Sequence, residues 1–199
     1  MSTKALGIMA FGLALIGLAA VVVFGREDGA IWPFKSRSIA DRCQPENGLF
    51  GNFEAKRPQA EVADETFADG EGRERRLRDF QGKGVVLNFW ATWCAPCVKE
   101  MPALDRLSAL TGSNGIHVAA LSSDREGAAV VKEFYQKNGI KNLAVLVDPK
   151  SKLVMKSGAK GLPTTLLIDP AGREVGRVVG PAEWDSGPVA AFLRGCLQG

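Results

Sequence analysis

Apolar residues along the chain occur either in short unbroken runs or at helical spacing, and the two patterns alternate. Residues 85–90 are almost entirely apolar, β-branched or aromatic, which is typical of a strand covered on both faces. From Val98 to Leu110 the apolar residues recur every three positions, which predicts a helix with one buried stripe. Pro96 lies in the first turn of this helix, where proline is tolerated. The sequence therefore predicts a buried strand followed closely by an amphipathic helix.

Similar patterns predict the remaining elements. We expect strands at residues 115–122, 143–147, 161–169 and 174–179, and helices at residues 124–139, 150–157 and 184–197. The pair Asp69 and Gly70 predicts a hairpin over residues 67–73, and the turn at residues 169–172 predicts a second, antiparallel hairpin. Strands that alternate with helices indicate an α/β domain with a largely parallel sheet covered on both faces.

The N-terminal part of the chain contains a long apolar run. Residues 5–24 are 20 uncharged positions, which at 1.5 Å per residue can cross about 30 Å of hydrocarbon. The run exceeds the usual apolar length of a cleaved signal, about 7–15 residues. This favours an uncleaved anchor over residues 1–25, although the small residues Ala19 and Ala20 leave a cleaved signal sequence open. The weak charge bias around Lys4 favours a cytoplasmic N-terminus.

The segment after the anchor has no sustained period. Prolines and glycines interrupt residues 26–60, which therefore predict a linker that begins to pack onto the domain near Cys43. Residues 61–199 are expected to form the folded domain. The net charge of +3 is too small to argue for nucleic acid, and the mixed-sign run at residues 73–78 is interpreted as a solvated hairpin arm.

Candidate chemistry is concentrated at Cys94 and Cys97. The helix N-terminus predicted at Cys94 favours a thiolate, the species that attacks disulfides. With two residues between them, the cysteines are close enough to form a disulfide, so Cys97 can displace a substrate held on Cys94. A zinc site needs about four ligands, whereas the chain offers only His117 and two isolated cysteines besides this pair, so we expect no metal site.

The segment Phe-Trp-Ala-Thr-Trp-Cys-Ala-Pro-Cys at residues 89–97 resembles the active-site segment of the thioredoxin superfamily. It is most similar to the membrane-anchored branch of TlpA, ResA and CcmG, and the resemblance covers residues 61–199. It implies a thioredoxin-like fold, in which helices flank a central mixed β-sheet, behind an N-terminal transmembrane helix. It also implies a thiol–disulfide oxidoreductase that needs no organic cofactor.

The resemblance implies roles for further residues. The segment Gly-Leu-Pro-Thr-Thr at residues 161–165 resembles the one whose proline is cis and faces the redox disulfide, so we expect a cis bond between Leu162 and Pro163. The backbone of Leu162 would then pair with an extended substrate. Trp93, the residue directly before Cys94, would form an apolar platform on which partners dock. Trp90 is expected in the core.

Glu100 is the candidate for proton transfer. Cytosolic thioredoxins carry a buried aspartate where this chain has Asn88, and an amide cannot exchange a proton near neutral pH. The membrane-anchored relatives carry a glutamate six residues after the first cysteine, the position of Glu100. We hypothesise that burial beside Cys97 raises the pKa of Glu100 and suits it to this role. The alternative is a helix-surface glutamate paired with a neighbour.

Two cysteines remain outside the central pair. Cys43 lies before the domain and Cys196 in its last helix. Because isolated cysteines do not normally stay free in an oxidising compartment, we predict a structural disulfide between them. His117, in the middle of a buried strand pattern, is interpreted as a core or edge residue.

The resulting expectation is a periplasmic reductant, anchored by one span in a bacterial inner membrane with a cytoplasmic N-terminus. The family suggests client proteins with disulfides in cytochrome c maturation or cytochrome oxidase copper-centre assembly, and a membrane thiol transporter as electron donor. The alternative within the same chemistry is a disulfide oxidant of the DsbA type, because spacing does not fix the direction of exchange.

Three other classes are disfavoured. A peroxiredoxin needs a proline and a threonine where Leu87 and Ala91 stand. A copper site of the Sco type uses a Cys-x-x-x-Cys spacing and a distal histidine, neither of which matches this chain. A membrane-tethered binding module without turnover would not require both central cysteines, Pro163 and Trp93.

Overall fold

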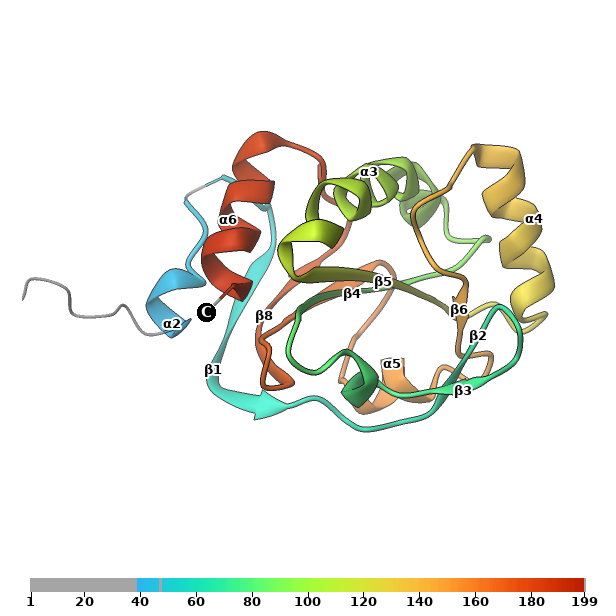
Figure 1. Ribbon diagram of the computed structural model, residues 1–199, viewed down its shortest axis with the longest axis horizontal. Coiled ribbons are helices and arrows are strands. Elements are labelled where there is room, and N and C mark those ends of the chain that lie inside the picture. Colours follow the sequence, from blue (N-terminus) through green and yellow to red (C-terminus); the bar gives the residue numbers. More distant parts are fainter. Residues whose placement is uncertain (1–38, 47, 199) are drawn as a thin grey trace, which may run out of the picture. The chain divides into compact units, whose positions relative to one another are not determined.

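An eight-stranded sheet forms the centre of the fold (Figure 1). The computed structural model describes residues 39–46 and 48–198. In their order across the sheet, the strands are β1 (Phe53–Glu61), β8 (Arg173–Val179), β7 (Thr164–Ile168), β4 (Gly84–Trp90), β5 (Ile116–Ser122), β6 (Leu146–Val147), β2 (Phe67–Asp69) and β3 (Glu74–Arg75). The helices are α2 (Ile39–Arg42), α3 (Ala95–Thr111), α4 (Ala128–Asn138), α5 (Lys152–Lys156) and α6 (Gly187–Leu197), with the 3₁₀ turns η1 (Leu77–Phe80) and η2 (Gly112–Asn114).

The predicted α/β fold with a mixed central sheet is confirmed, but the expectation of a largely parallel sheet is wrong. In the described sheet, β4, β5 and β6 run parallel, whereas the other neighbouring strands pair antiparallel. Both predicted hairpins form, β2–β3 and β7–β8, and each adds antiparallel strands to one side of the parallel centre. Strand β1 extends the antiparallel side further.

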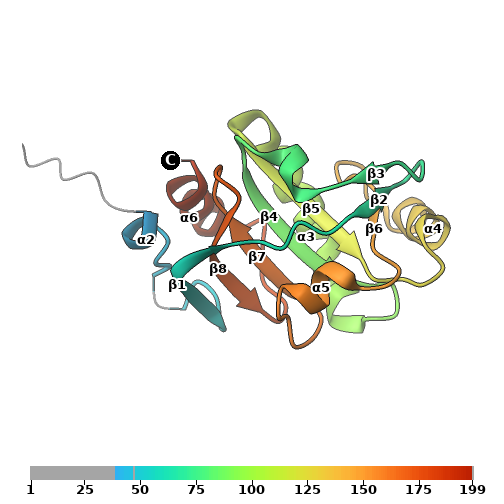
Figure 2. The same ribbon diagram turned by 90° about the horizontal axis from the view of Figure 1, so that it is seen from below.

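Strand β4 lies between two apolar clusters, which explains why all seven of its residues are buried. Val86 and Trp90 join the cluster formed with α3 and α6, while Val85, Leu87 and Phe89 join the cluster formed with η1 and α5. Figures 1 and 2 show α3 and α6 on one side of the sheet and α5 on the other. The apolar run predicted as a strand covered on both faces is therefore confirmed.

Strand β1 corrects the predicted linker. Residues 53–60 were expected to be part of an irregular segment, yet they pair with β8 at the edge of the sheet. The strand has no alternating apolar pattern because it is largely exposed, contains Pro58 and shifts register between Ala55 and Ala60. Its first residue packs closely on β8, since a Cβ atom at Gly176 would lie 2.5 Å from Cζ of Phe53. The folded part of the chain therefore begins before residue 61.

Three helices begin later than predicted, α5 by two residues, and the strands predicted at 143–147 and 161–169 are shorter than predicted. Helix α4 begins after Gly127 rather than near Asp124, because the Gly127 N–H donates to the Asp124 carbonyl and closes a turn at 3.1 Å. Helix α6 begins after Ser186, its N-cap, rather than at Trp184, which is fully buried ahead of the helix. Only the last two residues of the strand predicted at 143–147 pair in the sheet.

The predicted anchor, residues 5–24, lies outside the described residues. Among the helices of the described part of the chain, none has the length and apolar character needed to cross a bilayer.

Candidate active site

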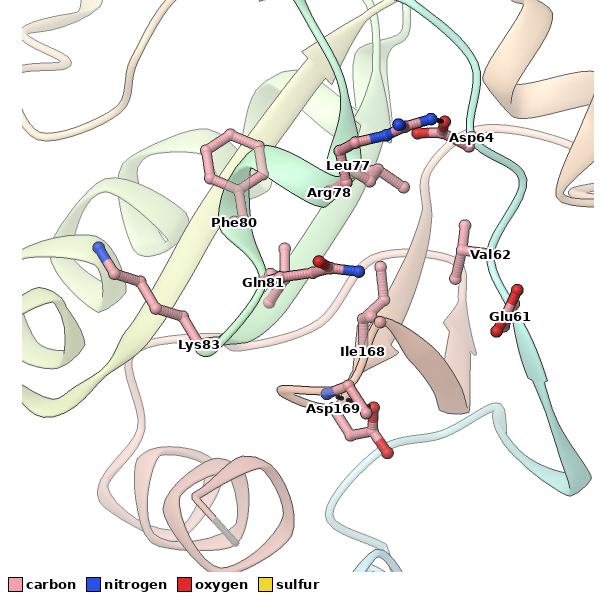
Figure 3. Close-up of a pocket in the computed structure, with 13 residues that line it drawn as sticks. Glu61, Val62, Asp64, Leu77, Arg78, Phe80, Gln81, Lys83, Ile168 and Asp169 are labelled. Carbon is pink, nitrogen blue, oxygen red and sulfur yellow. Dashed lines mark hydrogen bonds and ion pairs between the residues drawn. The ribbon is translucent and has the colours of Figure 1, made fainter.

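A pocket of about 230 Å³ opens beside η1 and the turn between β7 and β8 (Figure 3). Leu77, Val85 and Ile168 line its apolar part, and Asp64 and Arg78 form an ion pair at its edge. No cysteine lines this pocket. Val85 lies near the start of β4, so the pocket is at the opposite end of that strand from the predicted redox cysteines.

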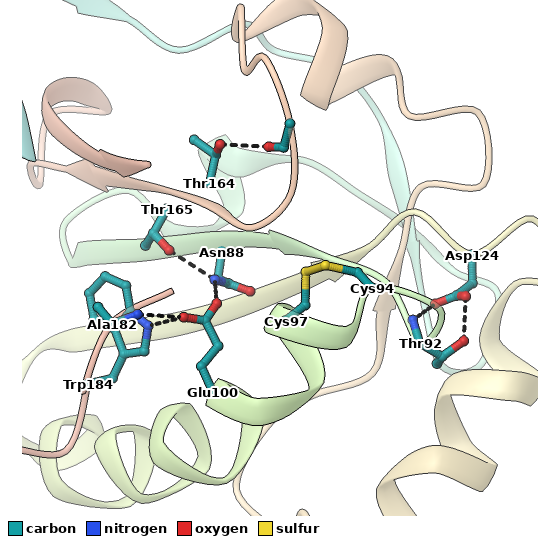
Figure 4. The surroundings of a disulfide bond; sticks show 11 residues. Asn88, Thr92, Cys94, Cys97, Glu100, Asp124, Thr164, Thr165, Ala182 and Trp184 are labelled. Carbon is teal, nitrogen blue, oxygen red and sulfur yellow. Dashed lines mark hydrogen bonds between the residues drawn. A yellow bond between two sulfur atoms is a disulfide. The ribbon is translucent and has the colours of Figure 1, made fainter. Parts of the chain in front are cut away.

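Cys94 and Cys97 form a disulfide bond where β4 leads into α3 (Figure 4). Cys94 is the N-cap residue of α3, and Pro96 lies in the first turn, as the sequence predicts. The side chain of Cys94 is 7% exposed, whereas Cys97 is fully buried. The free N–H groups at the start of the helix favour a thiolate on Cys94. The first cysteine is thus the more accessible of the two and the better placed to ionise.

A buried carboxylate fixes the loop that leads to Cys94. Asp124, 1% exposed, accepts hydrogen bonds from the backbone N–H and the hydroxyl of Thr92 at 2.9 and 2.7 Å. It also accepts from the Ser122 hydroxyl at 2.7 Å. Asp124 was not among the predicted site residues. The signal that could have identified it is the polar pair Ser123 and Asp124 directly after a buried strand. The carboxyl ends of parallel strands meet at one edge of a sheet, so such residues lie near the end of the neighbouring strand.

Glu100 is buried in the first turns of α3 and receives three hydrogen bonds. Its Oε1 accepts from Nδ2 of Asn88 at 2.8 Å, and its Oε2 accepts from the Ala182 N–H at 3.0 Å and from Nε1 of Trp184 at 2.9 Å. Burial raises the pKa of Glu100 above its usual range, and the hydrogen bonds from Trp184, Ala182 and Asn88 oppose the rise. The alternative of a helix-surface glutamate paired with a neighbour is wrong, because Glu100 is only 4% exposed.

Asn88 connects Glu100 to strand β7. Its Nδ2 donates both to Glu100 and to Oγ1 of Thr165, the latter at 2.9 Å. Its Oδ1 is buried and has no hydrogen-bond partner among the described residues. In the view of Figure 4, this oxygen points toward the side of the amide on which the disulfide lies. Where cytosolic thioredoxins carry a buried aspartate, this chain therefore has a polar amide, that of Asn88, which does not ionise and lies next to the Glu100 carboxylate.

The loop before β7 lies at the same end of β4 as the disulfide, since Thr164 pairs with Phe89, and Trp93 directly precedes Cys94. The peptide bond between Leu162 and Pro163 is cis, as predicted. Among the described residues, no backbone–backbone hydrogen bond uses the N–H or the carbonyl of Leu162. The side chain of Trp93 is 69% exposed, whereas Trp90 is fully buried, so both tryptophans lie where the sequence placed them. These free backbone groups and the apolar ring are available to a partner.

Residues 52–173 match the AhpC/TSA family. This chain belongs to the AhpC/TSA family of thioredoxin-like proteins. Among its relatives in this family, the thiol-disulfide oxidoreductase ResA of Bacillus thuringiensis (strain Al Hakam) is 38% identical over 133 residues, 67% of this chain and 76% of the relative. ResA of Geobacillus thermodenitrificans is 35% identical over 129 residues, 63% of this chain and 73% of the relative.

Solved structures give the same assignment. The pneumococcal exposed lipoprotein thioredoxin Etrx1 of Streptococcus pneumoniae is 33% identical, with a TM-score of 0.57 over 66% of this chain and 98% of its own. A Chlorobium tepidum protein, described as a thiol:disulfide interchange protein DsbE, is 28% identical, with a TM-score of 0.60 over 68% of this chain and 96% of its own. This AhpC/TSA family member is therefore a thiol–disulfide oxidoreductase of the ResA and DsbE type.

The remaining predicted residues lie outside the redox disulfide. Cys43 and Cys196 form the predicted second disulfide, which joins the residue after α2 to α6. His117, partly buried in β5, stacks on Phe80 with ring centroids 4.3 Å apart, and burial lowers its pKa. In the part of the chain that the structure describes, no three His, Cys, Asp or Glu side chains are grouped to hold a metal ion.

Proposed function

We propose that this oxidoreductase is a membrane-anchored reductant that acts on client disulfides on the periplasmic side of a bacterial inner membrane. The observation that carries the proposal is the Cys94–Cys97 disulfide at the start of α3, next to an exposed Trp93. Cys94 keeps 7% of its surface exposed whereas Cys97 keeps none, so Cys94 is the cysteine that a segment of another protein can reach.

The exchange takes place in two steps. The Cys94 thiolate attacks one sulfur of the client disulfide, forms a mixed disulfide and releases the other client sulfur as a thiolate. The Cys97 thiolate then attacks Sγ of Cys94, which forms the Cys94–Cys97 bond and releases the second client thiolate. The client gains two electrons and two protons, and the chain loses them. The unpaired backbone groups of Leu162 would hold the client as an added strand during both steps.

Glu100 would remove the proton from Cys97 before the second step. The two residues are three positions apart in α3 and therefore lie on the same face of the helix. Oε1 of Glu100 accepts one hydrogen bond, from Asn88, and has a second lone pair to receive a proton. The raised pKa of Glu100 brings its proton affinity closer to the operating pH, which is the property a proton-transfer group needs.

The proposed location is supported by three observations. The buried Cys43–Cys196 disulfide is of a kind that persists in oxidising compartments. A structural relative, Etrx1, is described as an exposed lipoprotein. Residues 5–24 have the length and composition of a membrane span. We therefore propose residues 1–25 as a single-pass anchor with a cytoplasmic N-terminus, followed by a periplasmic catalytic domain.

The resemblance to TlpA, ResA and CcmG supports a defined set of clients. We propose assembly factors of cytochrome c or of the cytochrome oxidase copper centre, with a membrane thiol transporter supplying the electrons. No organic cofactor takes part in this exchange, because the two thiols carry both electrons.

A trapping experiment tests this function. In the Cys97→Ser variant the mixed disulfide cannot be resolved, so client proteins should remain linked to Cys94 and appear in non-reducing gels of cell membranes. Cys94→Ser is the matched control and should trap nothing. Trapping of newly exported proteins in general, together with net disulfide formation in them by the wild-type protein, would instead indicate the oxidant of the DsbA type.

A further inference from the structure

Four exposed lysines follow strand β6. Lys150, Lys152, Lys156 and Lys160 form what we name the lysine patch, and none of them makes an ion pair with a described residue. The arginines of the β2–β3 hairpin differ in this respect, because carboxylates of the same region pair with them. The positive charge of the lysine patch is thus available to an external partner.

Acidic groups near the lysine patch are already engaged. Asp148 is buried, and its carboxylate accepts a backbone N–H of α5 at 2.8 Å. Glu174 is buried and accepts from the Arg177 guanidinium at 2.6 and 2.8 Å. Glu74 shares a hollow of about 330 Å³ with the first two lysines, but it also lies 3.4 Å from Arg76. Glu54 faces Arg177 on the neighbouring strand and interacts with that guanidinium. These contacts leave the patch with a net positive charge.

The two ends of the lysine patch lie at the same edge of the sheet as the redox disulfide, whereas α5, which carries Lys152 and Lys156, covers the face of the sheet opposite α3. The final residues of β4, β5 and β6 are paired neighbours, so the segment after β6 emerges at the edge where Cys94 follows β4. Lys160 is three residues before Pro163, which is at most about 11 Å of extended chain. This separation is close to the screening length of about 10 Å at 0.1 M salt. Met155, 67% exposed, adds an apolar contact between the lysines.

We propose that the lysine patch binds acidic residues that flank the target disulfide of a client protein. This inference rests on the proposed reductant function and specifies the chemistry of the partner. A client segment lying along Leu162 would bring its neighbouring residues past Lys160 and Lys156. Opposite charges at this position increase the rate of encounter and fix the orientation of the segment.

The test compares disulfides that differ in flanking charge. The reduced full chain, in neutral detergent, is mixed with two peptides that share one disulfide and carry either aspartates and glutamates or serines around it. The neutral compound hydroxyethyl disulfide measures exchange without docking. At about 20 mM salt we expect the acidic peptide to react about 10-fold faster than the serine peptide, and this preference should disappear at about 500 mM salt.

A double variant assigns the preference to the patch. Lys156→Glu with Lys160→Glu should lower the rate on the acidic peptide about 10-fold more than the rate on the serine peptide. Lys83→Glu with Lys141→Glu changes the net charge equally, but these lysines precede β4 and β6 at the opposite edge of the sheet. This control should keep the preference.

The remaining outcomes contradict the proposal in distinguishable ways. Equal rates on both peptides, with hydroxyethyl disulfide still reduced, would overturn the docking role and leave the reductant function intact. No reduction of any of the three disulfides would contradict both the docking role and the proposed reductant function. Equal peptide rates combined with protection of the lysine patch from amine labelling only in nanodiscs that contain phosphatidylglycerol would assign the patch to a membrane surface instead.

Discussion

Replacing Glu100 by glutamine separates proton transfer from packing. The carboxylate accepts from Asn88, Ala182 and Trp184 at 2.8–3.0 Å, whereas an amide has one acceptor oxygen and adds two N–H donors. The new amide can keep its oxygen toward Ala182 and Trp184. Because Oδ1 of Asn88 has no hydrogen-bond partner in the part of the chain that the structure describes, the Asn88 amide can rotate and accept from the new N–H and from the Thr165 hydroxyl. We therefore expect a folded variant that loses only about 1 kcal/mol near pH 5.

The stability difference should change with pH in a defined direction. The raised pKa means that the folded state binds the Glu100 proton more tightly than the unfolded state. The resulting stabilisation is complete below the unfolded pKa, about 4.3, and is lost as pH rises through the folded pKa, at about 1.4 kcal/mol for each unit of difference. Glu100→Gln has no such group. In urea unfolding of the oxidised proteins between pH 4 and 8, the free energy of unfolding of the variant should rise relative to that of the wild type as pH rises.

The same variant should slow the second step of exchange. Reduced protein is mixed with a peptide disulfide, quenched with acid, and the mixed disulfide on Cys94 is quantified by mass spectrometry. We expect it to persist about 100-fold longer in Glu100→Gln near pH 6, with a smaller effect at higher pH, where solvent ionises Cys97. Asp105→Asn is the control, since Asp105 is a buried carboxylate in the same helix that accepts the backbone N–H groups of residues 141–143. Identical pH–rate profiles for wild type and Glu100→Gln would refute the proton-transfer role.

Three further predictions concern stability and docking. Replacing Cys43 and Cys196 by alanine removes a disulfide between residues 153 positions apart and should lower the free energy of unfolding by up to about 5 kcal/mol. An unchanged urea midpoint would contradict this prediction. Trp93→Ala should keep stability within about 0.5 kcal/mol, yet reduce a protein disulfide about 10-fold more slowly; equal rates would exclude the docking role. Gly84→Ala places a Cβ atom 2.5 Å from Cβ of Leu197 and should cost about 1–3 kcal/mol in thermal or urea unfolding, whereas wild-type stability would contradict the packing of α6 on β4.

The sequence predicts well what depends on local pattern. The strand β4, the cysteines after it and the helix α3 follow one another within a short stretch, so apolar spacing and helix-start chemistry are sufficient to place Cys94 and Cys97. The pairing of Cys43 with Cys196 was also predicted, because few alternatives remain once the central pair is assigned.

Contacts between distant residues were not predictable in this way. Trp184 lies 84 positions from the carboxylate it hydrogen-bonds, and its sequence neighbourhood indicated only the start of a helix. Strand β1 carries too few buried residues to produce an alternating pattern, because it is the edge strand of the described sheet and pairs there with β8 alone. The role of Asp124 depends on the parallel pairing of β4 and β5, which brings it to Thr92.

The reduction potential of the Cys94–Cys97 pair tests the central claim most directly. The full chain is equilibrated with defined ratios of reduced and oxidised dithiothreitol, and differential alkylation with peptide mapping counts these two thiols separately from Cys43 and Cys196. A reductant should show a value near that of thioredoxin, about −270 mV. A value near that of DsbA, about −120 mV, would contradict the claim and make the protein a donor of disulfides.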